Sequence, residues 1–251
     1  MSPITDSEAK NTVTGVPIPT PAVEALFTVG THIGYSKARQ NPKMKEFIFG
    51  VRNNVEIFDL ALTDKKLAEA EAFLKSLGRE GKQVLWVGSK PSAKVHIEQV
   101  AQALGMPYVS LRWLGGTLTN MKIFEQRLSH WDRLEKELES GGFDKYVKKE
   151  RLLKMVELRK LSRMFGGLKS MKSLPAALVV VDPAEEKTAV SEARRKKIPI
   201  IALLNSDCNP EGILHPIPGN DSVSSSIELI LGRLRDAYKS GRSEKPETPI
   251  A

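Results

Sequence analysis

The sequence is poor in cysteine and histidine, and this limits the chemistry that it can support. Cys208 is the only cysteine among 251 residues, which excludes an intramolecular disulfide and any metal cluster held by several cysteines, and is typical of a reducing compartment. The histidines are scattered, and none stands at metal-ligand spacing from another: His32, His96, His130 and His215. We therefore predict no bound metal and no cofactor.

Long hydrophobic runs are also missing. No stretch approaches the roughly 18 apolar residues that a membrane-spanning helix needs. The first 21 residues lack the basic start and the apolar run of a signal peptide. We expect a soluble, cytoplasmic protein without a membrane partner.

The usual signatures of nucleotide binding and catalysis are absent as well. The sequence contains neither a P-loop nor a Gly-x-Gly-x-x-Gly fingerprint, and no nucleophile elbow or paired-carboxylate pattern stands out. Gly88, Ser89 and Lys90 lie between an apolar run and a helical pattern, where backbone N–H groups favour an anion. A simple crossover turn is the preferred interpretation, and an RNA phosphate at Lys90 is the functional one.

Asp182 is the best remaining candidate for an active-site group. It ends an apolar run, where α/β enzymes often place catalytic residues, but an aspartate there also commonly caps a turn. We predict no catalytic residue and no small-molecule substrate. A phosphate-handling enzyme that uses Lys90 and Asp182 stays the alternative, and a nucleotide or phosphosugar that raises the melting temperature would support it.

Positive charge, in contrast, is plentiful. Lys and Arg number 38 against 30 Asp and Glu, which gives a formal net charge of +8 and a pI near 9.5. Lys and Arg release condensed counterions when they neutralise phosphates, so a polyanion is an expected partner. Nucleic acid is the first candidate and an anionic membrane surface the second.

Apolar periodicity predicts an α/β fold. Short runs at residues 47–51 and 55–58 flank Asn53 and Asn54, which favours a β-hairpin because Asn tolerates positive φ. A helix is expected from Asp64, capped by Thr63. Apolar runs predict strands at residues 83–87, 108–111, 176–181 and 198–204, and helical spacing predicts helices at 93–104, 185–196 and 222–238. A three-layer sandwich around a mostly parallel sheet follows.

Residues 121–171 interrupt this alternation. They contain no strand pattern, and two helical stripes flank a Ser-Gly-Gly sequence, so we predict an inserted antiparallel helical hairpin that projects from the body. The α/β body then comprises residues 22–120 and 172–240. Residues 1–21 and 241–251 read as a flexible arm and tail.

Two basic clusters are candidate RNA contacts. The first lies around the β-hairpin and contains Lys37, Arg39, Lys43, Lys45 and Arg52. The second lies on the second helix of the insertion and includes Lys148, Lys149, Arg151, Arg159 and Arg163. Such groups suit the phosphates of folded RNA, but a solvated helix and an ordinary basic loop remain open interpretations.

The most unusual segment is residues 112–120, which read Arg-Trp-Leu-Gly-Gly-Thr-Leu-Thr-Asn. Together with other segments in the same order, it resembles the bacterial-type ribosomal protein S2 family over residues 27–238. The other segments are Gly-Thr-His-Ile-Gly at 30–34, Asn-Pro-Lys-Met at 41–44, Ile-Phe-Asp-Leu at 57–60, Val-Gly-Ser-Lys at 87–90, Glu-Ala at 192–193 with Ile-Pro at 198–199, and Pro-Ile-Pro-Gly-Asn-Asp at 216–221.

This resemblance implies a non-catalytic constituent of the small ribosomal subunit that binds 16S rRNA, has other small-subunit proteins as neighbours and, in some bacteria, helps to dock ribosomal protein S1. Arg112, Trp113 and Asn120 become RNA-contact candidates, although Arg112 and Asn120 could equally brace their own loop. An RNA-binding regulator outside the ribosome is a further alternative.

The chain departs from the family pattern at a few positions. Tyr35 stands where a second histidine is usual, Gln40 where a tryptophan is usual, and Asn205 where an aspartate is common. The metal site that some members form through such groups is therefore not predicted here.

Overall fold

The computed structural model describes residues 20–244. The arm predicted over residues 1–21 and the tail predicted over residues 241–251 fall largely outside this range. In chain order the helices are α1 (Pro21–Thr28), α2 (Leu60–Arg79), α3 (Pro91–Leu104), α4 (Met121–Glu139), α5 (Lys148–Phe165), α6 (Lys187–Arg195) and α7 (Ser224–Ser243). The strands are β1 (Ile33–Ser36), β2 (Ile48–Arg52), β3 (Val55–Phe58), β4 (Val84–Val87), β5 (Tyr108–Val109), β6 (Ala177–Val181), β7 (Ile200–Leu204) and β8 (His215–Pro218). Short 3₁₀ helices are η1 (Lys37–Arg39), η2 (Pro42–Phe47), η3 (Gly142–Lys145) and η4 (Gly166–Leu168).

A parallel sheet of five strands organises the body. Its strand order is β5-β4-β6-β7-β8, and a separate antiparallel sheet has the order β1-β3-β2. In the centre, Trp86 of β4 pairs with Val179 of β6. Every residue of β4, β6 and β7 is buried, as strands covered on both faces require. The predicted α/β class is confirmed.

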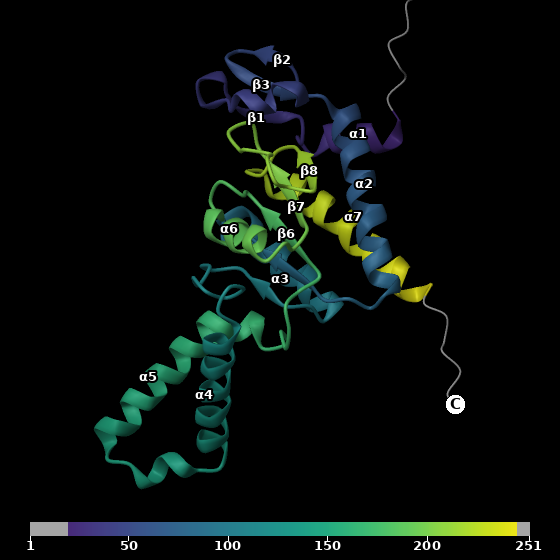
Figure 1. Ribbon diagram of the computed structural model, residues 1–251. Helices are drawn as coiled ribbons and strands as arrows, with labels where there is room; N and C mark the ends of the chain where they lie inside the picture. The colour runs from purple at the N-terminus through teal and green to yellow at the C-terminus, as the bar shows by residue number, and fades with distance from the viewer. Residues whose placement is uncertain (1–19, 245–251) are drawn as a thin grey trace, which may run out of the picture.

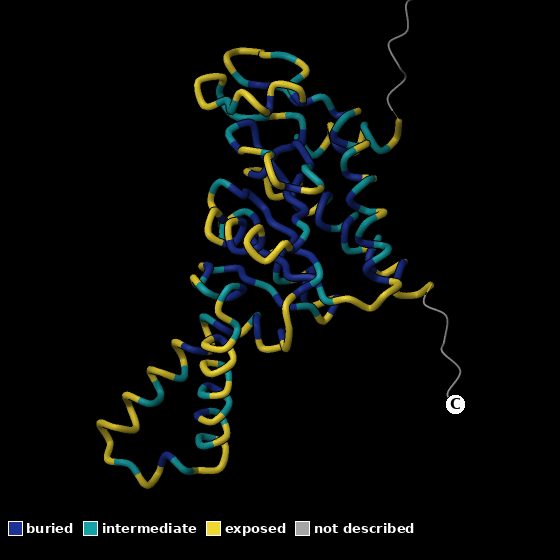
Figure 2. Tube along the Cα trace, in the orientation of Figure 1, coloured by how far each residue is buried: buried dark blue, intermediate teal, exposed yellow. Residues whose placement is uncertain are grey.

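Helices cover both faces of the parallel sheet (Figure 1). Leu85 and Val180 belong to the core that contains α6 and the base of the insertion. Trp86 and Val179 belong to the core that contains α2, α3 and α7. The alternation of side chains along each strand therefore builds two cores, which Figure 2 shows as a continuous buried centre. This arrangement confirms the three-layer sandwich.

The start of α2 was predicted wrongly. The helix begins at Leu60 and not at Asp64, because the Asp59 carboxylate accepts hydrogen bonds from the N–H groups of Ala61 at 2.9 Å and Leu62 at 3.4 Å. Thr63 is fully buried, and its hydroxyl lies 2.9 Å from the Pro218 carbonyl oxygen. Thr63 therefore lies within the helix and does not cap it.

The ends of two other elements also differ from the prediction. Strand β5 ends at Val109 and not at residue 111, whereas α7 continues to Ser243 beyond the expected end at residue 238. The prediction for the hairpin is confirmed: Asn53 and Asn54 have φ of 50° and 63° between β2 and β3. Within residues 20–244, each helix is too short or too polar to cross a membrane.

The segment between β5 and β6 forms a helical hairpin that projects from one end of the body (Figure 1). The chain runs outward along α4, turns through η3 and returns along α5. The predicted seam is buried at Phe124, Trp131, Leu134, Leu161 and Phe165. At the base, a Cβ on Gly167 would collide with the Tyr108 carbonyl oxygen, so a glycine is needed where η4 meets β5.

Candidate nucleic-acid interface

A glycine-containing loop, residues 110–120, joins β5 to α4 at the base of the hairpin. Gly116 has φ of 94°, in the left-handed region that favours glycine. The side chains of Trp113, Thr117 and Leu118 are buried, whereas Arg112 and Asn120 are exposed. The loop therefore has an inner side that packs on the body and an outer side that faces solvent.

Glu192 of α6 holds the inner side of this loop. One carboxylate oxygen accepts hydrogen bonds from Trp113 Nε1 at 3.0 Å and the Gly116 N–H at 2.7 Å. The other accepts from the N–H groups of Leu118 and Thr119 and from the Thr119 hydroxyl, each at 3.0 Å. Burial by itself would raise the pKa of Glu192, but these donors outweigh it, and the pKa lies below its ordinary value.

The sequence analysis does not predict this set of hydrogen bonds between Glu192 and the loop, which we call the Glu192 clamp. The available signal was a charged residue on an apolar helix face, because Glu192 is buried between Ala189, Val190 and Ala193 on α6. A buried carboxylate requires hydrogen-bond donors, and the glycine loop supplies them.

The three candidates in the loop separate into two kinds. Trp113 is 7% exposed, and its indole N–H is bound to Glu192. Arg112 and Asn120 are exposed, and no hydrogen bond or ion pair joins either side chain to another described residue. The bracing considered for these two side chains is performed by Glu192 instead.

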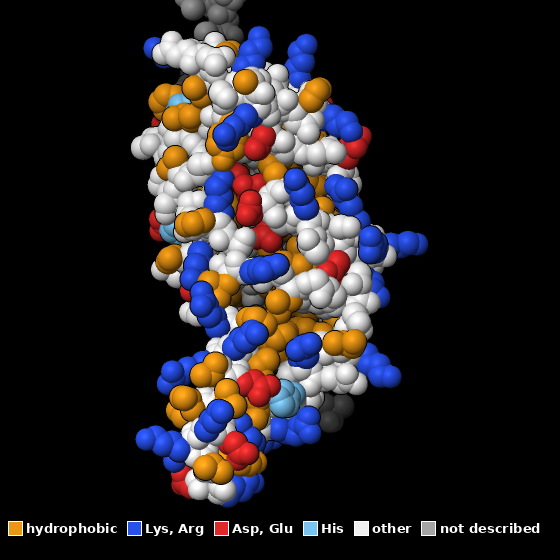
Figure 3. Space-filling model, turned by 90° about the vertical axis from the view of Figure 1, so that its left-hand side faces the viewer, with side chains coloured by type: hydrophobic (Ala, Val, Ile, Leu, Met, Phe, Trp, Pro, Cys, Tyr) orange, Lys and Arg blue, Asp and Glu red, His pale blue; other side chains and the backbone are white. Residues whose placement is uncertain are grey.

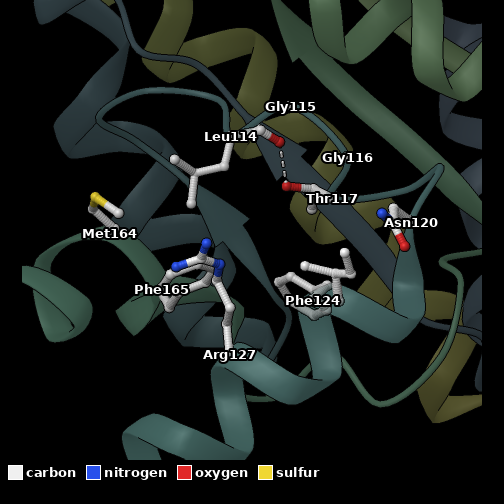
Figure 4. A pocket seen from close by; sticks show the side chains of 10 residues that line it. Leu114, Gly115, Gly116, Thr117, Asn120, Phe124, Arg127, Met164 and Phe165 are labelled. Carbon is white, nitrogen blue, oxygen red and sulfur yellow. Dashed lines mark hydrogen bonds between the residues drawn. The ribbon is translucent and has the colours of Figure 1, made fainter.

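A pocket opens between the loop and the base of the hairpin (Figure 4). It encloses about 310 Å³. The loop contributes Leu114 and Gly116, α4 contributes Phe124 and Arg127, and α5 contributes Phe165. An adjoining hollow is lined by Arg112, Lys160 and Arg163, so cations of the loop and of α5 border one continuous surface.

The basic residues of the hairpin divide into paired and unpaired groups. Glu137 of α4 contacts Lys154 at 2.9 Å and Lys145 at 3.1 Å, and their bonds, together with one from Tyr146, lower the pKa of Glu137 to about 2. Arg151 pairs with Asp144 at 2.8 Å.

The remaining cations of α5 point to solvent. They are exposed and form no ion pair with residues 20–244: Lys148, Lys149, Arg159, Lys160 and Arg163. Exposed apolar side chains lie among them, Leu152 at 62% and Val156 at 53% exposure. The outer face of α5 is therefore basic, with an apolar component.

The first basic cluster lies at the opposite end of the molecule, on η1, η2 and the end of β2 (Figure 1). All of its members are exposed: Lys37, Arg39, Lys43, Lys45 and Arg52. Lys43 pairs with Glu211 at 2.5 Å, and Arg39 lies 5.6 Å from the centre of the Tyr35 ring. Figure 3 shows the side of the molecule that lies on the left in Figure 1. Lys and Arg side chains occur along its whole length, and several acidic side chains lie near its middle.

Lys90 is placed differently from the other candidates. Its ammonium group lies 3.2 Å from Asp182, 3.1 Å from Asp221 and 3.0 Å from the Tyr35 hydroxyl. Burial alone would lower the pKa of Lys90, but these partners raise it. The preceding N–H, that of Ser89, is bound to Glu186 at 2.8 Å. Neither the Lys90 ammonium group nor the Ser89 N–H is therefore free to bind an approaching phosphate.

The Lys90 cluster contains the partner of Asp182 that the sequence did not reveal. It also includes Asn205, which donates to Asp221 at 2.6 Å. Burial raises the pKa of the neighbouring Cys208 thiol, so this thiol is a poor nucleophile. Among residues 20–244, no three His, Cys, Asp or Glu side chains gather as a metal site.

A comparison with protein families gives one finding. A family model described as ribosomal protein S2 matches residues 26–241 of the chain. The match includes the glycine loop, the helical hairpin and both sheets.

Proposed function

The chain belongs to the ribosomal protein S2 family, and from this we infer that it acts by binding rRNA in the small ribosomal subunit without catalysing a reaction. Members of this family are structural proteins of that subunit. In this proposal the protein lies in the ribosome, and particular surfaces of it contact rRNA.

One observation carries the RNA-binding proposal. Arg112 of the loop and Lys160 and Arg163 of α5 border one hollow without an ion-pair partner among the described residues. Unpaired cations can neutralise phosphates and release counterions, whereas Lys154 and Arg151 are already neutralised within the hairpin. The primary RNA surface is thus the outer side of the loop and the adjoining face of α5, which Lys148, Lys149 and Arg159 extend.

The cluster on η1, η2 and β2 forms a second, separate contact in this proposal. Because it lies at the far end of the body, the protein would hold two RNA segments at a fixed distance. Residues 121–171 act as an inserted helical hairpin, which carries the α5 part of the primary surface. Residues 22–120 and 172–240 act as the body, which carries the glycine loop and the second contact. Trp113 and Lys90 serve the fold instead of RNA, since their polar atoms are bound inside the protein.

The enzyme alternative loses support from the same contacts. The Lys90 ammonium is neutralised by the carboxylates of Asp182 and Asp221, and a saturated ion-pair network offers a substrate phosphate little. Docking of ribosomal protein S1 remains a prediction from the family resemblance alone.

The test combines sedimentation with cross-linking. In a sucrose gradient at high salt, the full chain should co-sediment with small ribosomal subunits; a regulator outside the ribosome would stay at the top. Photo-cross-linkers at Lys160 and Arg163 should attach to 16S rRNA. A matched cross-linker at Arg242 of α7 should not. Cross-links from Arg242 but none from α5 would refute the assignment of this surface.

A further inference from the structure

The pocket below the glycine loop has the size of a site for a small flat group. Its volume of about 310 Å³ is near the lower end of the roughly 300–1,000 Å³ usual for ligand sites. Phe124 and Phe165 pack on each other at its base, with ring centroids 6.0 Å apart. Ile123 and Met164 add further apolar walls. The apolar part of the lining therefore favours a planar group.

Three polar side chains also line the pocket, those of Thr117, Asn120 and Arg127. The Asn120 amide offers two donors and an acceptor, and none of them is bound to another described residue. Arg127 extends from α4 into the pocket that Phe165 also lines (Figure 4), and a guanidinium plane can stack on a flat ring. Thr117 is already occupied, because its hydroxyl donates to the Leu114 carbonyl at 2.6 Å.

The charged residues that line the pocket and the adjoining hollow are all basic, whereas Glu185 and Glu186 line a further hollow beside Arg112. Neither this pocket nor the adjoining hollow is lined by an acidic residue, whereas Arg112, Arg127, Lys160 and Arg163 line one or the other. An apolar peptide side chain would fit the floor but gains nothing from these cations. A nucleobase in the pocket would bring a phosphate on each side within their reach.

We propose that this pocket receives one unpaired nucleobase of the rRNA, with Asn120 hydrogen-bonded to its edge and Arg127 stacked on its face. The inference rests on the proposed RNA-binding function and adds to it the recognition of an unstacked base. RNA is read in sequence mainly through such splayed bases. The Glu192 hydrogen bonds fix the loop before RNA arrives, which limits the conformational entropy lost on binding.

Gly115 provides a way to block the pocket. It lines the pocket, its φ is not positive, and a Cβ added there meets nothing within 4 Å. Gly115→Leu should therefore fold normally and obstruct a base. Gly232→Leu is the matched control, since Gly232 lies on α7 and its Cβ would also meet nothing within 4 Å.

The experiment uses small subunits reconstituted with the full chain. Hydroxyl-radical footprinting reports contact with the RNA backbone, and dimethyl sulfate and a carbodiimide report the Watson–Crick edges of unpaired bases. With the wild type and Gly232→Leu, one unpaired base near the backbone footprint should be protected. With Gly115→Leu, that base should become as reactive as in subunits that lack the chain, while the backbone footprint persists.

Each other outcome is decisive. Identical base reactivity for all three proteins beside an intact backbone footprint would overturn the pocket proposal and leave RNA binding standing. Absence of any footprint with the wild type would overturn the proposed function itself. If Gly115→Leu prevents incorporation into the subunit, Asn120→Ala is used in its place, because it removes only the exposed amide. The unpaired base that the wild type protects must then become more reactive, or the pocket proposal is wrong. A photo-cross-linker at Ile123 that captures a protein instead of RNA would also overturn the proposal.

Discussion

Replacing Glu192 with Gln tests whether one buried carboxylate determines the shape of the glycine loop. Glu192 is 5% exposed, and both of its oxygens accept hydrogen bonds from residues of the loop. Gln has nearly the same size but keeps only one acceptor oxygen. Its NH₂ group must face either Trp113 and Gly116 or Leu118 and Thr119, which present N–H donors of their own.

The expected loss follows from the bonds that cannot be remade. A hydrogen bond to a charged group contributes about 1.5–3 kcal/mol, and a buried donor left without an acceptor costs about 1–3 kcal/mol. At least two donors lose their acceptor in either orientation of the amide, but losses within one network do not add fully. We expect the free energy of unfolding to fall by about 2–4 kcal/mol, a large share of the roughly 5–15 kcal/mol typical of a protein.

Urea unfolding followed by circular dichroism measures this change, with Glu185→Gln as control. Glu185 is exposed, and its carboxylate has no hydrogen-bond partner among the described residues. In the Glu192 variant, hydrogen exchange should also accelerate either at the Gly116 amide or at the amides of Leu118 and Thr119, whichever the new NH₂ group faces. Equal urea midpoints for the two variants, with unchanged exchange at these amides, would refute the clamp.

The stabilising effect of Glu192 should also depend on pH, in a direction that follows from its pKa. The pKa of Glu192 in the folded protein lies below its ordinary value of 4.5. The stability that this carboxylate contributes is therefore complete above about pH 4.5 and is lost as the pH falls through the lowered pKa of the folded state. Below pH 4.5 the difference in stability between wild type and Glu192→Gln should shrink. A difference that stays constant down to pH 2 would contradict the assigned role.

The remaining predictions concern the cations. Arg112→Ala should weaken rRNA binding without changing the free energy of unfolding by more than about 0.5 kcal/mol, and Arg242→Ala on α7 should change neither. Lys90→Met should cost about 3–5 kcal/mol of stability, because two carboxylates lose their counter-charge; a nucleotide that stabilises the wild type but not Lys90→Met would instead support the enzyme alternative. Arg163→Gln should reduce the slope of log affinity against log salt by about 1, whereas Lys154→Gln, whose charge pairs with Glu137, should leave that slope unchanged.

The sequence predicts the central sheet well and its margins poorly. Strands β6 and β7 are continuous apolar runs, and burial on both faces leaves few other arrangements for them. Strand β8 was missed because Pro216 and Pro218 weaken its pattern. It is an edge strand, where a proline that cannot donate to the ladder is tolerated.

The sequence locates the candidate interface, but it does not show which of the basic residues are paired within the protein and which are free to bind RNA. Counting charges along α5 treats Lys154 and Arg163 alike, although Glu137, seventeen residues before Lys154, neutralises only the former. Likewise Lys90 and Asp182 are 92 residues apart and meet only after the sheet brings the ends of β4 and β6 together. Pairing across such separations depends on the tertiary fold, which composition and spacing do not encode.

The loop at residues 112–120 has one side that packs on the body and an opposite side that faces solvent. Trp113 and Leu118 face inward, where a helix face with a single buried carboxylate requires a matching set of donors. Arg112, Gly115 and Asn120 face outward, where nothing in the described protein uses them. Fold stability accounts for the first set and not for the second. If RNA binding is what the outer set serves, substitutions there should leave the unfolding free energy unchanged and alter only assembly into the subunit, the reverse of the pattern expected at Glu192.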